Sequence, residues 1–202
     1  MRLPEQVVLA GQYVELRPLC AAHHDELCEV VADGGLWRSP VALVPSPQEM
    51  SAYIQGGLKA RTAGHGWPFV VVQRRSAQLV GHIAYRRISL RDSRLEVGSI
   101  FVRRGHQGSA VFAESCRLLL SHAFEELDCA RAEFFTDARN LVARQAIRAL
   151  GATEEGVLRS HYLAADGGRG DTVCFGVLRD EWPEIRGLLD RRIAAKAGAS
   201  FS

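Results

Sequence analysis

The chain has 202 residues, of which 47% are hydrophobic and 24% are charged, and its formal net charge at pH 7 is +2. This length suits one domain with a full core, so we expect residues 1–202 to form a single domain that ends in a C-terminal helix and tail over 183–202. The small net charge and the lack of a basic run argue against nucleic-acid binding. No apolar run approaches the roughly 18 residues of a membrane-spanning helix, so we expect no membrane segment.

Cysteine and histidine usage gives no sign of a metal site. The cysteines number five, and none stands in a CxxC pair, which is typical of reduced thiols in a cytoplasmic protein. The seven histidines show no HExxH or similar spacing. His23 and His24 are adjacent, but neighbours in a helix point in different directions. We therefore expect no bound metal and a cytoplasmic location.

The first third of the chain alternates between short strands and helices. Residues 7–19 show a strand pattern that is interrupted at Gly11, and residues 21–32 carry an apolar helical face. Three prolines make residues 36–47 irregular. Ser46 is expected to cap a second helix that runs to about Thr62, because a proline follows it and a glutamate stands three positions later.

Three strands follow over residues 67–73, 79–88 and 95–102, and their short turns predict an antiparallel meander. Next come an apolar-periodic helix over 110–127, a strand over 131–136 and a helix that Asn140 caps and Gly151 ends. Two strands over 153–163 and 172–178 enclose a Gly-rich loop over 164–170, and a helix over 180–195 closes the chain. This order predicts an α/β fold, with a mixed, mostly antiparallel central sheet flanked by helices.

The stretch from Val102 to Phe124 is the most informative about function. It passes from the end of an apolar strand through a basic, glycine-containing turn into a long helix. A helix N-terminus has unpaired N–H groups and a partial positive charge, so this turn is expected to hold an anion. No Gly-Lys-Ser/Thr follows, and the turn lacks the GxGxxG pattern, which excludes a Walker loop and a dinucleotide fingerprint.

The turn resembles the pyrophosphate motif of the GNAT superfamily of acyl-CoA-dependent N-acetyltransferases. In that motif Gln or Arg is followed by small residues at the fourth and sixth positions. Gln107 and Ala110 match the first and fourth positions, whereas Phe112 departs at the sixth. The resemblance is closest to the RimJ/RimL-type branch and covers about residues 14–182. It rests on RLEVGSIFV, on the cofactor turn and helix, and above all on the spacing N-x-x-x-R-x-A-I-x-x-L-G-A-x-x-E-G over 140–156.

The resemblance implies that acetyl-CoA is the acyl donor. Backbone N–H groups of the turn would face its pyrophosphate, and the strand before the turn would pair with its pantetheine arm. One strand N–H would polarise the thioester carbonyl. Arg103 and Arg104 either contact the 3′-phosphate or are solvated turn residues. The residues expected to bind the cofactor are Ile100, Phe101, Val102, Gln107, Gly108, Ser109, Ala110, Val111, Phe112, Ala113 and Asn140.

Two residues are candidates for catalysis. Glu96 stands where some GNAT enzymes place a general base, and partial burial would raise its pKa. Its alternative role is an ion pair with Arg86 or Arg94. His161, just before the last strands, is the second candidate. Ala143 occupies the position of a serine that assists the leaving thiol in many relatives, which leaves water to protonate the thiolate.

The predicted function is transfer of acetyl from acetyl-CoA to a primary amine by direct attack in a ternary complex. The branch suggests a protein N-terminus as acceptor, and the alternative is a small amine such as a metabolite or antibiotic. Trp37 and Trp67 either line the acceptor groove or pack in the core. An acyl-CoA-binding protein with little activity is a third hypothesis, motivated by Phe112 and Ala143. The protein is expected to be a monomer or a homodimer.

Overall fold

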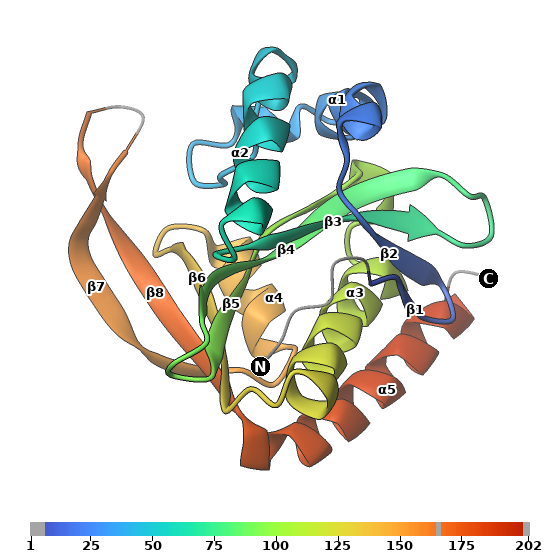
Figure 1. The fold of residues 1–202 in the computed structure, drawn as a ribbon, viewed down its shortest axis with the longest axis vertical. Coiled ribbons are helices and arrows are strands. Elements are labelled where there is room, and N and C mark those ends of the chain that lie inside the picture. Colours follow the sequence, from blue (N-terminus) through green and yellow to red (C-terminus); the bar gives the residue numbers. More distant parts are fainter. Residues whose placement is uncertain (1–6, 165–166, 200–202) are drawn as a thin grey trace.

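A computed structural model describes residues 7–164 and 167–199. In this part of the chain an eight-stranded sheet has the order β1-β2-β3-β4-β5-β6-β8-β7 (Figure 1). Neighbouring strands are antiparallel except β5 and β6, which are parallel, so the expected fold class is confirmed. The strands are β1 Leu9–Ala10, β2 Val14–Pro18, β3 Trp67–Gln73, β4 Leu79–Ser89, β5 Arg94–Val102, β6 Arg131–Asp137, β7 Thr153–Leu163 and β8 Arg169–Leu178. The α-helices are α1 His24–Ala32, α2 Met50–Thr62, α3 Ala110–Ser121, α4 Leu141–Arg148 and α5 Trp182–Ala199.

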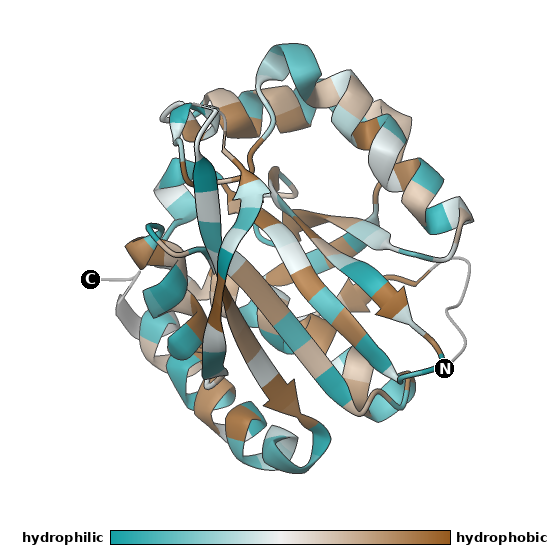
Figure 2. Cartoon of the chain, turned by 90° about the vertical axis from the view of Figure 1, so that its left-hand side faces the viewer, coloured by the Kyte–Doolittle hydropathy of each residue, from teal (hydrophilic) through white to brown (hydrophobic). Residues whose placement is uncertain are grey.

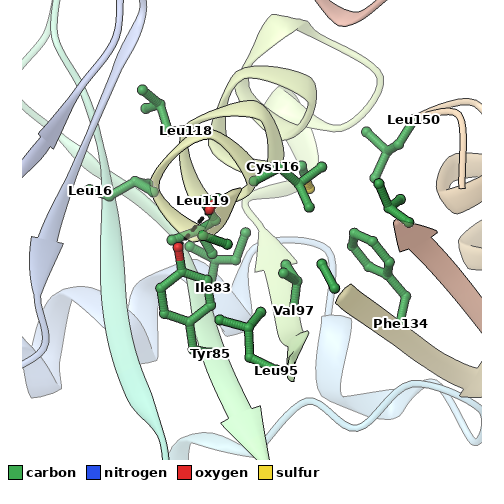
Figure 3. Packing of buried hydrophobic residues seen from close by; sticks show 14 of the residues in the cluster. Leu16, Ile83, Tyr85, Leu95, Val97, Cys116, Leu118, Leu119, Phe134 and Leu150 are labelled. Atoms are coloured by element: carbon green, nitrogen blue, oxygen red, sulfur yellow. Dashed lines mark hydrogen bonds between the residues drawn. The ribbon is translucent and has the colours of Figure 1, made fainter. Parts of the chain in front are cut away.

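Hydrophobic side chains cover both faces of the sheet. On one face the larger core joins the strands to α3, α4 and α5, and Figure 3 shows part of it around Leu119 and Phe134. On the other face a smaller core joins β3, β4 and β5 to α1 and α2. Hydrophobic and hydrophilic residues alternate along the helices, as expected of amphipathic helices that cover a sheet (Figure 2). The two cores place α2 opposite α3, with the middle of the sheet between them.

Local sequence signals identify most of these elements correctly. Glu49 accepts a hydrogen bond from the backbone N–H of Ser46 at 2.9 Å, as the predicted capping box requires. Two of the differences from the predicted boundaries have a clear physical cause. Strand β8 begins at Arg169, inside the expected loop, because Leu163 and Tyr162 pair with Arg169 and Gly170 and lengthen the hairpin. Residues 165–166 of that loop and 200–202 of the expected tail lie outside the described residues.

The second difference concerns the helix predicted over 110–127. It is α-helical only to Ser121 and continues as a π-helical turn over His122–Glu126. The Tyr85 hydroxyl from β4 donates to the carbonyl of Leu119 at 2.6 Å (Figure 3). The same hydroxyl lies 3.0 Å from Nδ1 of His122. A side chain that inserts into the helical hydrogen-bond ladder in this way widens the turn. The helical period in the sequence gives no sign of that contact.

Strands β5 and β6 separate soon after they meet. Their parallel ladder pairs only Arg94–Glu96 with Arg131–Glu133. Beyond it, β5 continues to Val102 along β4, while β6 continues to Asp137 along β8. The backbone groups of β5 that face β6 beyond Glu96 therefore have no strand partner in this ladder. The opening lies between the end of β5 and the end of β6, where α3 and α4 follow.

A buried carboxylate anchors the first two strands to α3. Glu114 is 4% exposed, and its oxygens accept hydrogen bonds from the backbone N–H groups of Gln12, Tyr13 and Val14, each at 2.7 Å. A side chain at Gly11 would collide with this carboxylate, since an added Cβ would lie 2.5 Å from its Cδ. The turn between β1 and β2 thus fits one acidic residue on α3.

Candidate functional site

The turn before α3 has the geometry of an anion site. Gly108 has a φ of +73°, and an added Cβ would meet no atom within 4 Å, so the turn is open on that side. Ser109 is the N-cap: its Oγ accepts from the N–H of Val111 at 3.2 Å and donates to the carbonyl of His106 at 2.6 Å. The side chain accepts only one N–H of the first turn. Those of Ala110 and Phe112 are available to a ligand in this geometry.

The departure from the motif at Phe112 leaves the turn intact. The Phe112 side chain is partly buried and packs against the larger core, so it points away from the turn that its backbone helps to form. Ala110 and Ala113 are buried against Ile193 of α5. Small side chains at these positions let the backbone come close to a ligand.

The basic side chains near the turn differ in whether they contact it. Lys196 of α5 donates to the carbonyls of Gly108 and Ser109, and burial lowers the pKa of its amine. No sequence signal points to this lysine, which stands far along the chain. Arg103 reaches instead to Glu29 of α1, with an Nη2–Oε2 distance of 3.4 Å. The side chain of Arg104 lies beside Gly34.

The opening between β5 and β6 exposes backbone donors of the predicted strand. Arg103 donates its N–H to the carbonyl of Val80 in β4 at 2.7 Å. Because the N–H groups of successive residues in a strand point to opposite edges, the N–H of Val102 faces the β6 side. Ser99 has a φ of +50° within a stretch where the register between β4 and β5 shifts. This irregularity turns the backbone beside the opening.

Asn140 lies at the far side of the opening, at the start of α4. Its Oδ1 accepts from the N–H of Ala143 at 3.0 Å, which confirms its role as the N-cap. Its Nδ2 donates to the carbonyl of Val41 at 3.3 Å, which brings the irregular segment after α1 to this helix. Asn140 therefore stands between the end of β6 and the segment around Val41.

Glu96 is the last residue of β5 that pairs with β6, where it lies opposite Glu133, and it is 2% exposed. Its Oε1 lies 3.5 Å from Nη1 of Arg86, and its Oε2 lies 3.3 Å from Nε of Arg87. The second contact is an ion pair without hydrogen-bond geometry. Burial raises the pKa of Glu96; the two arginines partly offset this, and Glu133 adds to it. The expected pairing with Arg86 is confirmed, whereas Arg94 pairs with Glu133 at 3.0 Å instead.

The other residues singled out in the sequence are dispersed. His161 is exposed on the edge strand β7, where its Nδ1 lies 2.9 Å from Oγ1 of Thr172, and β8 and β6 separate it from β5. Trp37 is at the surface, whereas Trp67 is buried in the larger core and also lines a cleft on the α2 face of the sheet. The structure thus brings Glu96 to the opening and leaves His161 two strands away.

A cleft of about 580 Å³ lies on the α2 face of the sheet beside this opening. We call it the α2 cleft; it is lined by α2, the start of β3, the middle of β4 and Ser99 of β5. His82 of β4 lines it and is only 2% exposed. His82 was not predicted as a site residue, although a histidine inside the apolar strand GHIAY is a sequence feature that marks it as unusual.

Two other classes of site are absent from the described residues. Over 7–164 and 167–199, no group of histidine, cysteine, aspartate or glutamate side chains is arranged to hold a metal ion. In the same ranges, no helix combines the length and the apolar character needed to cross a bilayer.

Comparisons with known proteins agree on one family. A family model described as "Acetyltransferase (GNAT) domain" matches residues 14–153. A curated relative, "Putative ribosomal N-acetyltransferase YdaF" of Bacillus subtilis (strain 168), is 28% identical over 104 residues, which are 52% of this chain and 56% of the relative. The matched segment therefore spans little more than half the length of that relative.

Solved structures share the fold over nearly the whole chain. A GCN5-related N-acetyltransferase from Brucella melitensis is 26% identical, with a TM-score of 0.81, over 93% of this chain and 86% of the other. The ribosomal L7/L12 alpha-N-protein acetyltransferase RimL is 17% identical, with a TM-score of 0.77, over 86% of this chain and 94% of the other. At 17% identity, the similarity to RimL shows a shared fold only. The fold and the branch expected from the sequence agree with these relatives.

Proposed function

Because the chain belongs to the acetyltransferase (GNAT) domain family, we propose that it transfers an acetyl group from acetyl-CoA to a primary amine by direct attack in a ternary complex. The observation that carries this proposal is the pairing of an open helix N-terminus, capped by Ser109, with the separation of β5 and β6 directly before it. The helix N-terminus suits the pyrophosphate group, and the separation of the two strands suits the narrow pantetheine arm with its amide groups.

The residues around the turn and the opening fit acetyl-CoA. Gln107, Gly108 and the backbone from Ser109 to Ala113 would hold the pyrophosphate, with the left-handed Gly108 leaving room for it. Ile100, Phe101 and Val102 would hold the pantetheine arm along the free edge of β5, with Asn140 on the opposite side. Acetyl-CoA supplies the acetyl group in activated form, as a thioester.

Backbone donors would favour the attack. The N–H of Val102 faces the opening, and a fixed N–H aimed at the thioester oxygen stabilises the negative charge that develops there. Removing one such donor from an acyl-transfer site costs roughly 10²–10³ in rate in well-studied enzymes.

We assign Glu96 as the base that makes the incoming ammonium neutral, acting through water. Burial raises its pKa, which makes the carboxylate a better proton acceptor than an exposed one, and Arg86 and Arg87 hold it in place. His161 stays the second candidate, although β6 and β8 separate its strand from β5. Ala143 has no proton to give, so water would protonate the departing thiolate.

The acceptor we favour is a protein N-terminus, in keeping with the relative named a ribosomal N-acetyltransferase. A small amine is the second candidate, and the α2 cleft is large enough for either an N-terminal residue or a compact amine. The free thiols are consistent with the cytoplasmic location that we propose, where such groups stay reduced.

The test is a transfer assay with the purified protein and acetyl-CoA. A short peptide with N-terminal alanine and a panel of small amines serve as acceptors, and release of free CoA is measured. We expect acceptor-dependent release, and a Glu96→Gln variant that loses at least about tenfold in rate at neutral pH. Failure to bind CoA would overturn the proposal, whereas tight binding with no transfer would favour an acyl-CoA-binding protein.

A further inference from the structure

His82 is a buried polar residue that the assignments above leave without a role. Its ring is 2% exposed and lies between two aromatic side chains. It stacks on Phe101 of β5, with centroids 5.2 Å apart, and meets the edge of Tyr53 of α2 at 5.3 Å. The ring is therefore fixed in one plane, between the helix and the strand that border the α2 cleft.

The hydrogen bonds of the ring determine its tautomer. Nδ1 lies 2.8 Å from the carbonyl oxygen of Ser99 and 3.2 Å from the Tyr53 hydroxyl. A carbonyl oxygen only accepts, so Nδ1 carries the proton and donates it. Nε2 is then an unprotonated acceptor. Burial lowers the pKa of His82 to about 4, so the ring is neutral at pH 7.

Nε2 has no protein partner among the described residues, although it is completely shielded from solvent in the free protein. A buried acceptor without a partner is destabilising, so buried polar atoms are nearly always paired. The ring lines the α2 cleft, beside the irregular backbone at Ser99. Because Nε2 has almost no accessible surface in the free protein, an N–H donor that enters the cleft would supply the missing partner once the side chains around the ring move apart.

We propose that Nε2 of His82 is the atom that contacts the attacking amine, as a catalytic residue distinct from Glu96. This inference rests on the proposed acetyl transfer. Glu96 acts on the ammonium before attack, whereas His82 acts on the neutral amine. An N–H···Nε2 hydrogen bond directs the nitrogen lone pair away from His82, toward the opening between β5 and β6.

The same atom receives the proton that the nitrogen loses during transfer. As the N–C bond forms and the C–S bond breaks, the nitrogen gives one proton to Nε2 of His82, and the sulfur of CoA gains one proton from water. His82 then returns its proton to water, which balances the reaction. The low proton affinity of the buried ring favours this return, because the charged imidazole is poorly solvated between Tyr53 and Phe101.

Two substitutions separate contact from proton transfer. In His82→Asn the side-chain amide can still donate to Ser99, but nothing occupies the position of Nε2. In His82→Gln a neutral oxygen or nitrogen reaches that position without taking a proton. We expect both variants to lose at least about 100-fold in kcat with the alanine peptide, within the usual range for general base catalysis. Of the two variants, His82→Gln should have the lower KM for the peptide, because its side chain still reaches the position of Nε2.

The matched control is His24→Asn, the same change on the partly exposed face of α1, where the ring contacts Asp25. Affinity for CoA, measured by calorimetry, reports whether each variant is folded. A His82→Asn protein that binds CoA like the wild type and keeps its rate within threefold overturns the inference. If it loses CoA binding, the Gln variant provides the same comparison.

A readout independent of turnover uses the imidazole nitrogens of labelled protein in NMR spectra. In the free protein we expect the Nδ1-protonated tautomer of His82, and we expect the Nε2 resonance to shift when CoA and the alanine peptide are added together. The opposite tautomer, or an unchanged Nε2 resonance, would overturn the role of His82. Absence of transfer by the wild-type protein, in contrast, would overturn the proposed function.

Discussion

Single buried charges hold this fold in register, and Glu114 is the clearest of them. Because its carboxylate accepts three backbone N–H groups, Glu114→Gln replaces one acceptor by an amide that faces donors. We expect the free energy of unfolding to fall by about 2–4 kcal/mol, measured by urea denaturation.

The control is Glu184→Gln on α5, where the side chain is exposed and the change should stay within about 0.5 kcal/mol. Equal stability of the two variants would show that the β1–β2 turn does not depend on the charge of Glu114.

Asp137, at the end of β6, makes stability depend on pH. Its carboxylate pairs with Arg139 at 2.8 Å and accepts from Tyr162, and the arginine contact is the main cause of a pKa lowered to about 2. A carboxylate with a depressed pKa stabilises the fold above the pKa of the unfolded chain, near 3.8, and loses that effect as the pH falls toward 2. Between these values the wild type should lose more stability than Asp137→Asn, as judged by urea midpoints at each pH. If the urea midpoints of the two proteins fell equally with pH, Asp137 would not be the source of this pH dependence.

Local signals revealed some site residues and missed others. Ser46 and Asn140 were recognisable as caps because capping depends on neighbours in the sequence. The partners of Glu96 were only half predicted, because the positive φ of Arg87 places a second arginine against it. The pattern GHIAY marks His82 as an unusual residue in an apolar strand, but its partners Tyr53 and Ser99 lie far from it in the sequence, so its role could not be predicted.

At the scale of an element, the N-terminus of α3 offers a direct test of the cofactor assignment. Aspartate and asparagine are both good N-caps, so Ser109→Asp and Ser109→Asn should fold with near-native stability. Only the aspartate places a negative charge where the pyrophosphate is proposed to bind. We expect Ser109→Asp to weaken CoA binding at least about tenfold relative to Ser109→Asn, measured by calorimetry at low salt.

Thermal unfolding of both variants supplies the control for that comparison. Aspartate should be slightly the more stabilising of the two, because it favours the positive end of the helix. Equal CoA affinities would place the pyrophosphate elsewhere.

The elements themselves were largely predictable, since hydrophobic period and turn residues are local properties. The meander of β3, β4 and β5 followed from short turns alone. The π-helical turn after Ser121 was not predictable, because the Tyr85 hydroxyl that accompanies it comes from another element. The early start of β8 likewise reflects pairing with Tyr162 and Leu163 across the hairpin.

At the scale of the whole molecule, a ligand between β5 and β6 should stabilise the fold. At CoA concentrations about 100 times Kd, binding to the folded state adds about 2.7 kcal/mol. For a chain of this size that corresponds to a rise in Tm of roughly 5–10 °C, measured by calorimetry. The Ser109→Asp variant should show a smaller rise at the same concentration. An unchanged Tm of the wild type with saturating CoA would contradict the assignment.

The separation of β5 from β6 was beyond sequence reasoning. Both segments read as ordinary strands, and the length of a parallel ladder depends on tertiary packing that no local pattern records. The family resemblance predicted the cofactor, but it did not predict how few residues of β5 and β6 pair.

The short ladder between β5 and β6 also divides the molecule into two cooperative units. Three residue pairs join the five strands β1–β5 to the group β6, β8 and β7, whereas β6 and β8 share seven. Amide hydrogen exchange under native conditions should therefore reveal two levels of protection on either side of that ladder. The larger core contains side chains of both groups and of α3 and α5, so the best-buried amides of α3 should exchange only with global unfolding. The protein would then consist of two groups of strands that one core holds together, with their common border left open for another molecule to complete.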